Sequence, residues 1–166
     1  GGKLYLRRNG TGSETESVAA INLDIIHSEI FLTTNANQTR TLAAAAALTR
    51  SNYATALVST NDLGGTAAAS GSGQLTLPSA PTMVGGGGAA ATTEISIIPF
   101  LIAGTWANDT SNGVVSADRG STLVTYDAGT NSLRALDKST EYAASVDGVT
   151  GTTTNVRQTT AEALTD

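Results

Sequence analysis

The 166-residue chain contains no cysteine, which excludes disulfide bonds and thiolate metal sites. Only 14% of its residues are charged and only 4% are aromatic, although 40% are hydrophobic. Disordered chains are usually rich in charge and poor in apolar residues, so this composition predicts a folded protein. The length is sufficient for one domain with its own hydrophobic core.

Basic residues are too few to form a positive surface, because the net charge is −5 and the isoelectric point is near 4.7. Nucleic acids and anionic membranes are bound through clustered Lys and Arg, so the sequence argues against both as partners. The longest apolar run, 95–104, is interrupted by Ser96 and Pro99 and is shorter than the roughly 18 residues of a membrane helix. We therefore expect no membrane insertion, and no signal peptide is visible.

Residues that hold metals or cofactors are also scarce. His27 is the only histidine, and one histidine cannot form a zinc site without other ligands. The chain has no Asp-x-Asp-x-Asp-Gly calcium loop, and its glycine runs lack the Gly-Lys-Ser/Thr ending of a phosphate loop. The sequence thus predicts no cofactor and no metal centre, with opportunistic calcium binding at carboxylates in turns as the most that it allows.

What the chain does contain is a series of short strand-like runs, each closed by turn residues. Runs of about 4–8 residues at roughly ten-residue spacing are typical of an all-β sandwich, barrel or solenoid. Small aliphatic side chains and asparagines in the turns favour the solenoid, in which like residues stack in ladders. We predict an all-β fold, a right-handed parallel β-helix fragment with a hairpin-like excursion. The expected strands are 3–6, 18–26, 29–33, 40–49, 53–59 and 74–77.

The alanine run 43–47 allows two interpretations. Alanine is the best helix former, so a helix is one of them. The run lacks a capping residue with an acidic first turn, and a helix this short is marginal on its own. We therefore predict a strand with a tightly packed ladder of small residues.

Composition changes along the chain divide it into three parts. Residues 1–78 carry the rung-like pattern, and 79–148 form a Gly-rich loop followed by a β-hairpin excursion with ISIIPF and STLVTYD as strands. Residues 149–166 resemble the start of the next rung. Because the chain opens as GGKLYLRR and stops at TTAEALTD, we expect it to be an excerpt of a longer protein.

An ordered series of motifs carries a family resemblance. The motifs are LGGTAAASGSGQLTLPSAPTMVGGGG, ISIIPFLIAGTW, STLVTYDAGTNSLRAL, EYAAS and TNVRQTT, and they cover most of 63–157. The series resembles long planctomycete- and verrucomicrobial-type bacterial proteins with autotransporter-associated β-strand repeats. Leu123 stands where that family usually has Phe, and Ser132 replaces a Gly. The resemblance implies a parallel β-helix passenger region, secreted or on the cell surface, without catalytic residues.

These features predict a structural function. We expect a non-catalytic segment of a secreted or cell-surface bacterial protein, acting as a stalk, an adhesin scaffold or a self-assembling envelope fibre. Its partners would be neighbouring β-helix rungs of the same or another chain, and a homo-oligomer or fibre is possible because uncapped rungs expose unpaired edges.

Two alternatives remain open. A carbohydrate-active enzyme on a β-helix would need carboxylates converging on one groove, and the candidates are Asp109, Asp118, Arg119 and Asp127. A glycan-binding module could use Trp106 and Tyr126 as an aromatic platform, since aromatic faces stack on apolar sugar surfaces. For both aromatic residues we prefer packing of the excursion, and for the aspartates we prefer turn-capping.

Overall fold

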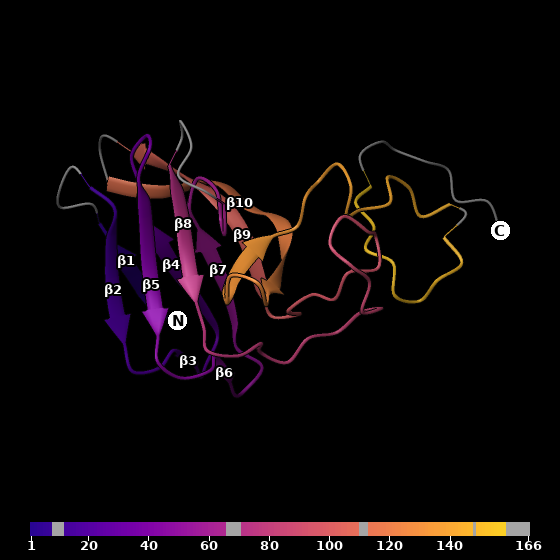
Figure 1. Cartoon of the computed structure of the whole chain (residues 1–166), viewed down its shortest axis with the longest axis horizontal. Helices are drawn as coiled ribbons and strands as arrows, with labels where there is room; N and C mark the ends of the chain where they lie inside the picture. The colour runs from indigo at the N-terminus through magenta and orange to yellow at the C-terminus, as the bar shows by residue number, and fades with distance from the viewer. Residues whose placement is uncertain (8–11, 66–70, 110–112, 148, 159–166) are drawn as a thin grey trace.

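The computed structural model describes residues 1–7, 12–65, 71–109, 113–147 and 149–158 (Figure 1). Within this part, only the backbone is described for 106–109 and 113–121. The described residues form strands and loops and contain no helix, so the all-β prediction is confirmed. The strands are β1 (Lys3–Leu6), β2 (Glu14–Val18), β3 (Asn22–Leu23), β4 (His27–Leu32), β5 (Thr39–Ala44), β6 (Thr49–Arg50), β7 (Thr55–Ser59), β8 (Ser72–Thr76), β9 (Leu101–Asp109), β10 (Gly113–Asp127) and β11 (Ser132–Ala135).

Nine of these strands belong to one continuous, curled sheet (Figure 1). On one side β1, β4, β7 and β9 pair in parallel, and on the other side β2, β5 and β8 pair in parallel. Antiparallel pairing of β9 with β10, β10 with β11 and β11 with β8 joins the two groups. Strands β3 and β6 form a separate parallel pair.

The sheet is therefore mixed, whereas the sequence predicted a parallel one. The physical reason lies in the short loop between β10 and β11, because a tight turn can join only antiparallel strands. In this turn Asn131 has a positive φ of 50°, and the Asp127 carboxylate accepts the N–H of Gly129 at 2.8 Å. Both are ordinary turn roles for Asn and Asp.

The parallel strands follow a regular sequence offset. Lys3 of β1 pairs with Glu29, and Glu14 of β2 pairs with Arg40. Hydrogen bonds between successive strands of these groups join residues 26, 27 or 28 positions apart. At the second step of the β2–β5–β8 group the offset lengthens, since Thr39 pairs with Ser72. The pairing thus repeats a unit of three short strands along the first part of the chain.

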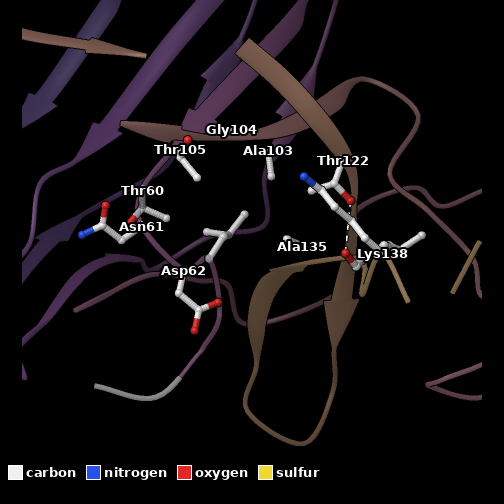
Figure 2. A pocket seen from close by; sticks show the side chains of 11 residues that line it. Thr60, Asn61, Asp62, Ala103, Gly104, Thr105, Thr122, Ala135 and Lys138 are labelled. Carbon is white, nitrogen blue, oxygen red and sulfur yellow. Dashed lines mark hydrogen bonds between the residues drawn. The ribbon is translucent and has the colours of Figure 1, made fainter. Parts of the chain in front are cut away.

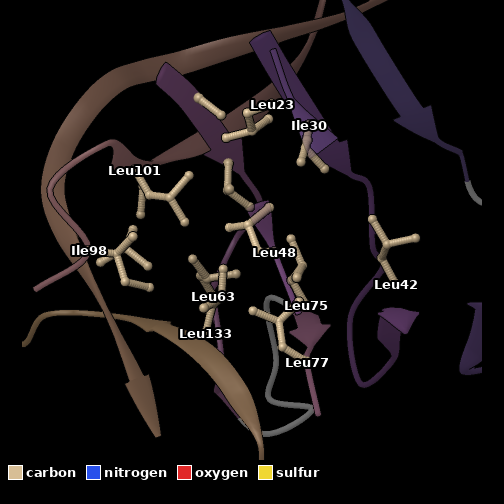
Figure 3. Packing of buried hydrophobic residues seen from close by; sticks show 14 of the residues in the cluster. Leu23, Ile30, Leu42, Leu48, Leu63, Leu75, Leu77, Ile98, Leu101 and Leu133 are labelled. Carbon is tan, nitrogen blue, oxygen red and sulfur yellow. The ribbon is translucent and has the colours of Figure 1, made fainter. Parts of the chain in front are cut away.

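The hydrophobic core lies between the two parallel groups, beneath the curl of the sheet (Figure 3). Leu32 comes from one group and Leu42 from the other, while Ile98 and Leu133 come from the later part of the chain, and none of the four side chains is exposed to solvent. Burial of each such side chain stabilises the fold by about 1.5–3 kcal/mol. Residues from both halves of the sequence therefore share one core.

Several strand boundaries differ from those predicted. Only the first two residues of the alanine run, Ala43 and Ala44, belong to β5, so the strand predicted at 40–49 is interrupted before β6 begins at Thr49. The range 18–26 is broken, because a strand precedes it at Glu14–Val18 and only Asn22–Leu23 pairs within it. ISIIPF makes only isolated bridges, such as Val84 with Ile97, and the regular strand begins at Leu101.

Candidate functional site

The two aromatic residues predicted to form a glycan platform lie in different places. Trp106 is in β9, where its backbone pairs with Ser116 of β10. Tyr126 lies near the other end of β10 and pairs with Leu133 of β11. At about 3.3 Å per residue, roughly 30 Å of strand separates Ser116 from Tyr126. The side chain of Trp106 lies outside the described part of the structure, but the backbone register separates the two positions.

The candidate carboxylates are separated in the same way. Asp109 pairs with Gly113 and Asp118 pairs with Thr105, so both lie toward the tip of the β9–β10 hairpin. Asp127 ends β10 and serves the turn described above. About nine residues of strand, or roughly 30 Å, separate Asp118 from Asp127. The side chains of Asp109, Asp118 and Arg119 are not described, and the backbone does not bring these positions to one groove with Asp127.

Tyr126 lines a hollow that also contains charged and polar side chains. This cavity of about 450 Å³ lies between the Gly-rich loop and the end of β10. Beside Tyr126 it contains Asp127, Arg134 and Ser96, which supply a carboxylate, a guanidinium and a hydroxyl. The Tyr126 hydroxyl donates to the Leu77 carbonyl at 3.2 Å and lies 3.0 Å from the Asn131 side-chain oxygen. These bonds orient the ring.

Arg134 is held by a buried carboxylate. Its two terminal nitrogens donate to Glu141 at 2.8 and 2.6 Å, a bidentate pair. Glu141 is only 1% exposed and also accepts the backbone N–H groups of Ala91 at 2.9 Å and Asp137 at 2.8 Å. Burial alone would raise the pKa of Glu141, but these hydrogen bonds outweigh it and lower the pKa below 4.5. The hydrogen bond with Glu141 raises the pKa of Arg134. The pair and its backbone donors thus join β11, the Gly-rich loop and the loop 137–141 by charge-assisted bonds.

A second polar chain connects β10 to the same loop. The backbone N–H of Leu123 donates to the Tyr142 hydroxyl oxygen at 2.7 Å. Tyr142 lies 2.8 Å from the Thr122 hydroxyl, which donates to the Leu136 carbonyl at 3.1 Å. Each hydroxyl thus has partners, and the bonds hold 136–142 against β10.

The last motif, TNVRQTT, also forms hydrogen bonds that hold a loop in place. The Asn155 side chain donates to the Ile95 carbonyl at 2.9 Å, and its backbone N–H donates to Thr93 at 2.7 Å. Thr125 of β10 donates to the Ser96 carbonyl at 2.7 Å. The Gly-rich loop and the ISIIPF segment are therefore held against β10 and β11. The residues that hold them come from four motifs, STLVTYD, SLRAL, EYAAS and TNVRQTT.

A smaller cavity, of about 170 Å³, lies beside β7 and β9 (Figure 2). Thr60, Asp62, Thr122 and Lys138 line it. A volume of this size corresponds to about six water molecules, at about 30 Å³ each in the liquid. No nucleophile paired with a base is found among its lining residues.

Two further features were looked for in the described residues, a metal-ligand group and a membrane-spanning helix. The described residues contain no group of three or more His, Asp or Glu side chains placed to hold a metal ion. His27 lies at the start of β4, where its ring nitrogen Nδ1 is 3.1 Å from the Thr55 hydroxyl on the neighbouring strand. In this same part of the chain, no helix is long and apolar enough to span a membrane.

No protein-family model, no curated protein and no solved structure matches this chain. Its function must therefore be argued from geometry. Sequence reasoning did not identify Arg134, Glu141 or Tyr142 as important residues. The available signal was their place in the motifs SLRAL and EYAAS, although nothing in the sequence indicated that they contact one another.

Proposed function

We propose that the chain is a segment of a right-handed parallel β-helix whose function is structural. The observation that carries this proposal is the repeated pairing of β1 with β4 and β7, of β2 with β5 and β8, and of β3 with β6. Three strands that each pair in parallel with the next unit, at offsets of 26 to 28 residues and of 33 residues for β5 with β8, are what a coiled chain with three-strand rungs would produce.

The internal use of polar residues supports a non-catalytic function. Glu141 has the lowered pKa and burial that often mark an active-site carboxylate, but all of its described partners are structural groups. Thr122, Tyr142 and Asn155 are likewise engaged within the fold. A chain that places its distinctive residues in loop-to-strand bonds is suited to be a stalk, an adhesin scaffold or an envelope fibre.

We further propose that this segment belongs to a secreted or cell-surface bacterial protein. The support is the resemblance of its motif series to that of the autotransporter-associated repeats, together with a net charge of −5. Antibodies against the chain should label intact producing cells or their culture medium. Labelling that appears only after the cells are lysed would contradict this localisation.

The β-helix register can be tested with introduced cysteines, because the chain has none. His27 and Thr55 are partners on adjacent strands, so His27→Cys with Thr55→Cys should form a disulfide on mild oxidation. The matched control is His27→Cys with Ser59→Cys, which lies four residues, or about 13 Å, further along β7. Equal cross-linking of both pairs, or of neither, would reject the register.

A glycan-binding module is the second candidate, and the cavity beside Tyr126 favours it. Tyr126, Asp127 and Arg134 combine an aromatic face with charged groups at one hollow of about 450 Å³, as sugar sites do. Tyr126→Ala should then abolish binding detected on a glycan array and by calorimetry. Tyr53→Ala is the control, because Tyr53 is 91% exposed and does not line this cavity. An array blank for the wild-type chain would remove this candidate.

A further inference from the structure

The two ends of the curled sheet are different. At one end, β9, β10 and β11 run from one parallel group to the other and close the space between them (Figure 1). At the other end, the outermost strands are β1 and β2. Among the described strands, β1 pairs only with β4, and β2 pairs only with β5. Each outermost strand therefore presents one edge whose backbone groups can accept a further strand.

The core is open at this second end. A cavity of about 460 Å³ lies between the two outermost strands, with Leu4 and Leu6 of β1 and Val18 of β2 in its lining. Leu4 is 40% exposed, although its partner Ile30 on the next strand is only 5% exposed. Leu6 and Ile30 belong to the hydrophobic core. The inner side chains of β1 and β2 thus form the outermost layer of the hydrophobic core, and this layer is partly exposed to solvent.

Glu16 places a charge at this open layer. It pairs with Leu42, which is completely buried, and paired residues of neighbouring strands project from the same face. Glu14 faces the same way, but the Arg40 guanidinium beside it forms an ion pair with it. Glu16 lines the cavity together with Arg7 and Arg40, and among the described residues it forms no ion pair. An inward-pointing charge on an edge strand is a known barrier to unwanted pairing.

We propose that the β1–β2 end is an interaction surface for a further pair of β-strands, and that Glu16 selects a partner with a lysine or arginine at the facing position. This inference rests on the β-helix proposed above. Cross-strand ion pairs already form on both outermost strands, Glu14 of β2 with Arg40 and Lys3 of β1 with Glu29 at 2.8 Å. The partner also has to place apolar side chains in contact with Leu4 and Leu6.

The same carboxylate opposes pairing between two copies of this chain. Among the described strands of the nine-stranded sheet, only β1 and β2 have an unpaired edge, so two copies that join their sheets would meet through their β1–β2 ends, with the strands antiparallel. Glu16 is the middle residue of β2, so in the register that pairs the whole strand it would face Glu16 of the second copy. Like charges directly opposite each other on one face destabilise a strand pair.

Charge reversal at this position tests the proposal. Sedimentation velocity is measured at low salt for the wild-type chain, for Glu16→Lys and for their equimolar mixture. We expect each protein alone to sediment as a monomer of 16.7 kDa and the mixture to form a one-to-one dimer. The dissociation constant of the mixed dimer should be at least about tenfold lower than that of either self-dimer, and it should rise with salt. A wild-type dimer of equal affinity, or a mixture that stays monomeric, would overturn the proposal.

Two further variants separate the role of the charge from folding defects. Thr15→Lys adds the same charge on the opposite face of β2, so its mixture with the wild type should remain monomeric. Glu16→Leu removes the repulsion, and this variant should self-associate. Circular dichroism establishes that each variant is folded. The His27→Cys with Thr55→Cys cross-link reports separately on the β-helix register, so failure of the strand-docking surface can be distinguished from failure of the proposed fold.

Discussion

Among the described residues, Glu141 is the charged residue least exposed to solvent. Four hydrogen bonds from two Arg134 nitrogens and two backbone N–H groups converge on a carboxylate that is 1% exposed. Breaking a buried, hydrogen-bonded ion pair leaves the remaining charge and donors without partners. This accounts for a glutamate in the core region of a protein that has few charges overall.

Glu141→Ala should therefore destabilise the protein by about 3 kcal/mol, within the range for loss of one partner of a buried pair. The measurement is urea unfolding followed by circular dichroism. Glu94→Ala serves as the control, because Glu94 is exposed and such substitutions usually change stability by less than about 0.5 kcal/mol. Equal effects of the two substitutions would show that the Arg134–Glu141 pair contributes little.

The acid sensitivity of the fold should depend on the same carboxylate. The pKa of Glu141 is lowered in the folded state, so its contribution is complete above the ordinary value of 4.5 and declines as the pH falls through the depressed pKa. Glu141→Gln removes this titration. The stability difference between wild type and Glu141→Gln should thus be constant from pH 7 to about pH 5 and shrink below about pH 4.5. A difference that grows on acidification would contradict the assigned direction.

For individual residues, the sequence indicated which motifs they belong to but not which other residues they contact. The motif residues Arg134, Glu141 and Tyr142 were visible in SLRAL and EYAAS. Their contacts depend on how 136–142 folds back over β10, and no periodicity in the sequence encodes that path. Asp127 was predicted to cap a turn, and its bond to Gly129 confirms this.

Strands were predictable where apolar and polar residues alternate, as in β1, whose observed bounds match the prediction. Strand β2 was missed because Glu14 and Glu16 occupy the positions that usually carry apolar residues. The sequence also gave no reason to place charges on the inner face of an outermost strand. ISIIPF was predicted to be a strand because it is rich in apolar residues. These residues do fill the core, but they do so from an irregular loop.

The central strands should carry most of the packing energy. Leu75 in β8 is 1% exposed and belongs to the core cluster, so Leu75→Ala should cost about 3 kcal/mol through lost burial and the cavity left behind. Thr76→Ala, on the next residue, is the matched control and should cost less than half as much. Chemical denaturation of the two variants measures this difference. Comparable losses would mean that Leu75 is not a core residue.

At the scale of the whole molecule, repetition in the first part of the chain predicted stacked strands, but not the way in which the sheet closes. The parallel pairs recur at offsets that can be found in a sequence pattern. Closure depends on β11 meeting β8 through one paired position, Ser132 with Thr76. A contact this limited leaves no pattern in the sequence. It nevertheless decides that the two ends of the molecule differ.

This closure makes a prediction about cooperativity. Independent rungs would unfold in steps, as in long repeat arrays, whereas a shared core that includes β10 and β11 should unfold in one transition. Leu133→Ala in β11 and Leu32→Ala in β4 alter opposite parts of a single hydrophobic cluster, and both residues are completely buried.

Each substitution should therefore lower the midpoint of the same thermal transition, with no second transition appearing. Calorimetry checks this, because the calorimetric and van't Hoff enthalpies should agree for the wild type and for both variants. The register cross-link between residues 27 and 55 offers a control, since it should raise the midpoint of the whole transition rather than split it. A variant with two resolved transitions, one unaffected by its substitution, would show that β9 to β11 form a unit separate from the parallel strands.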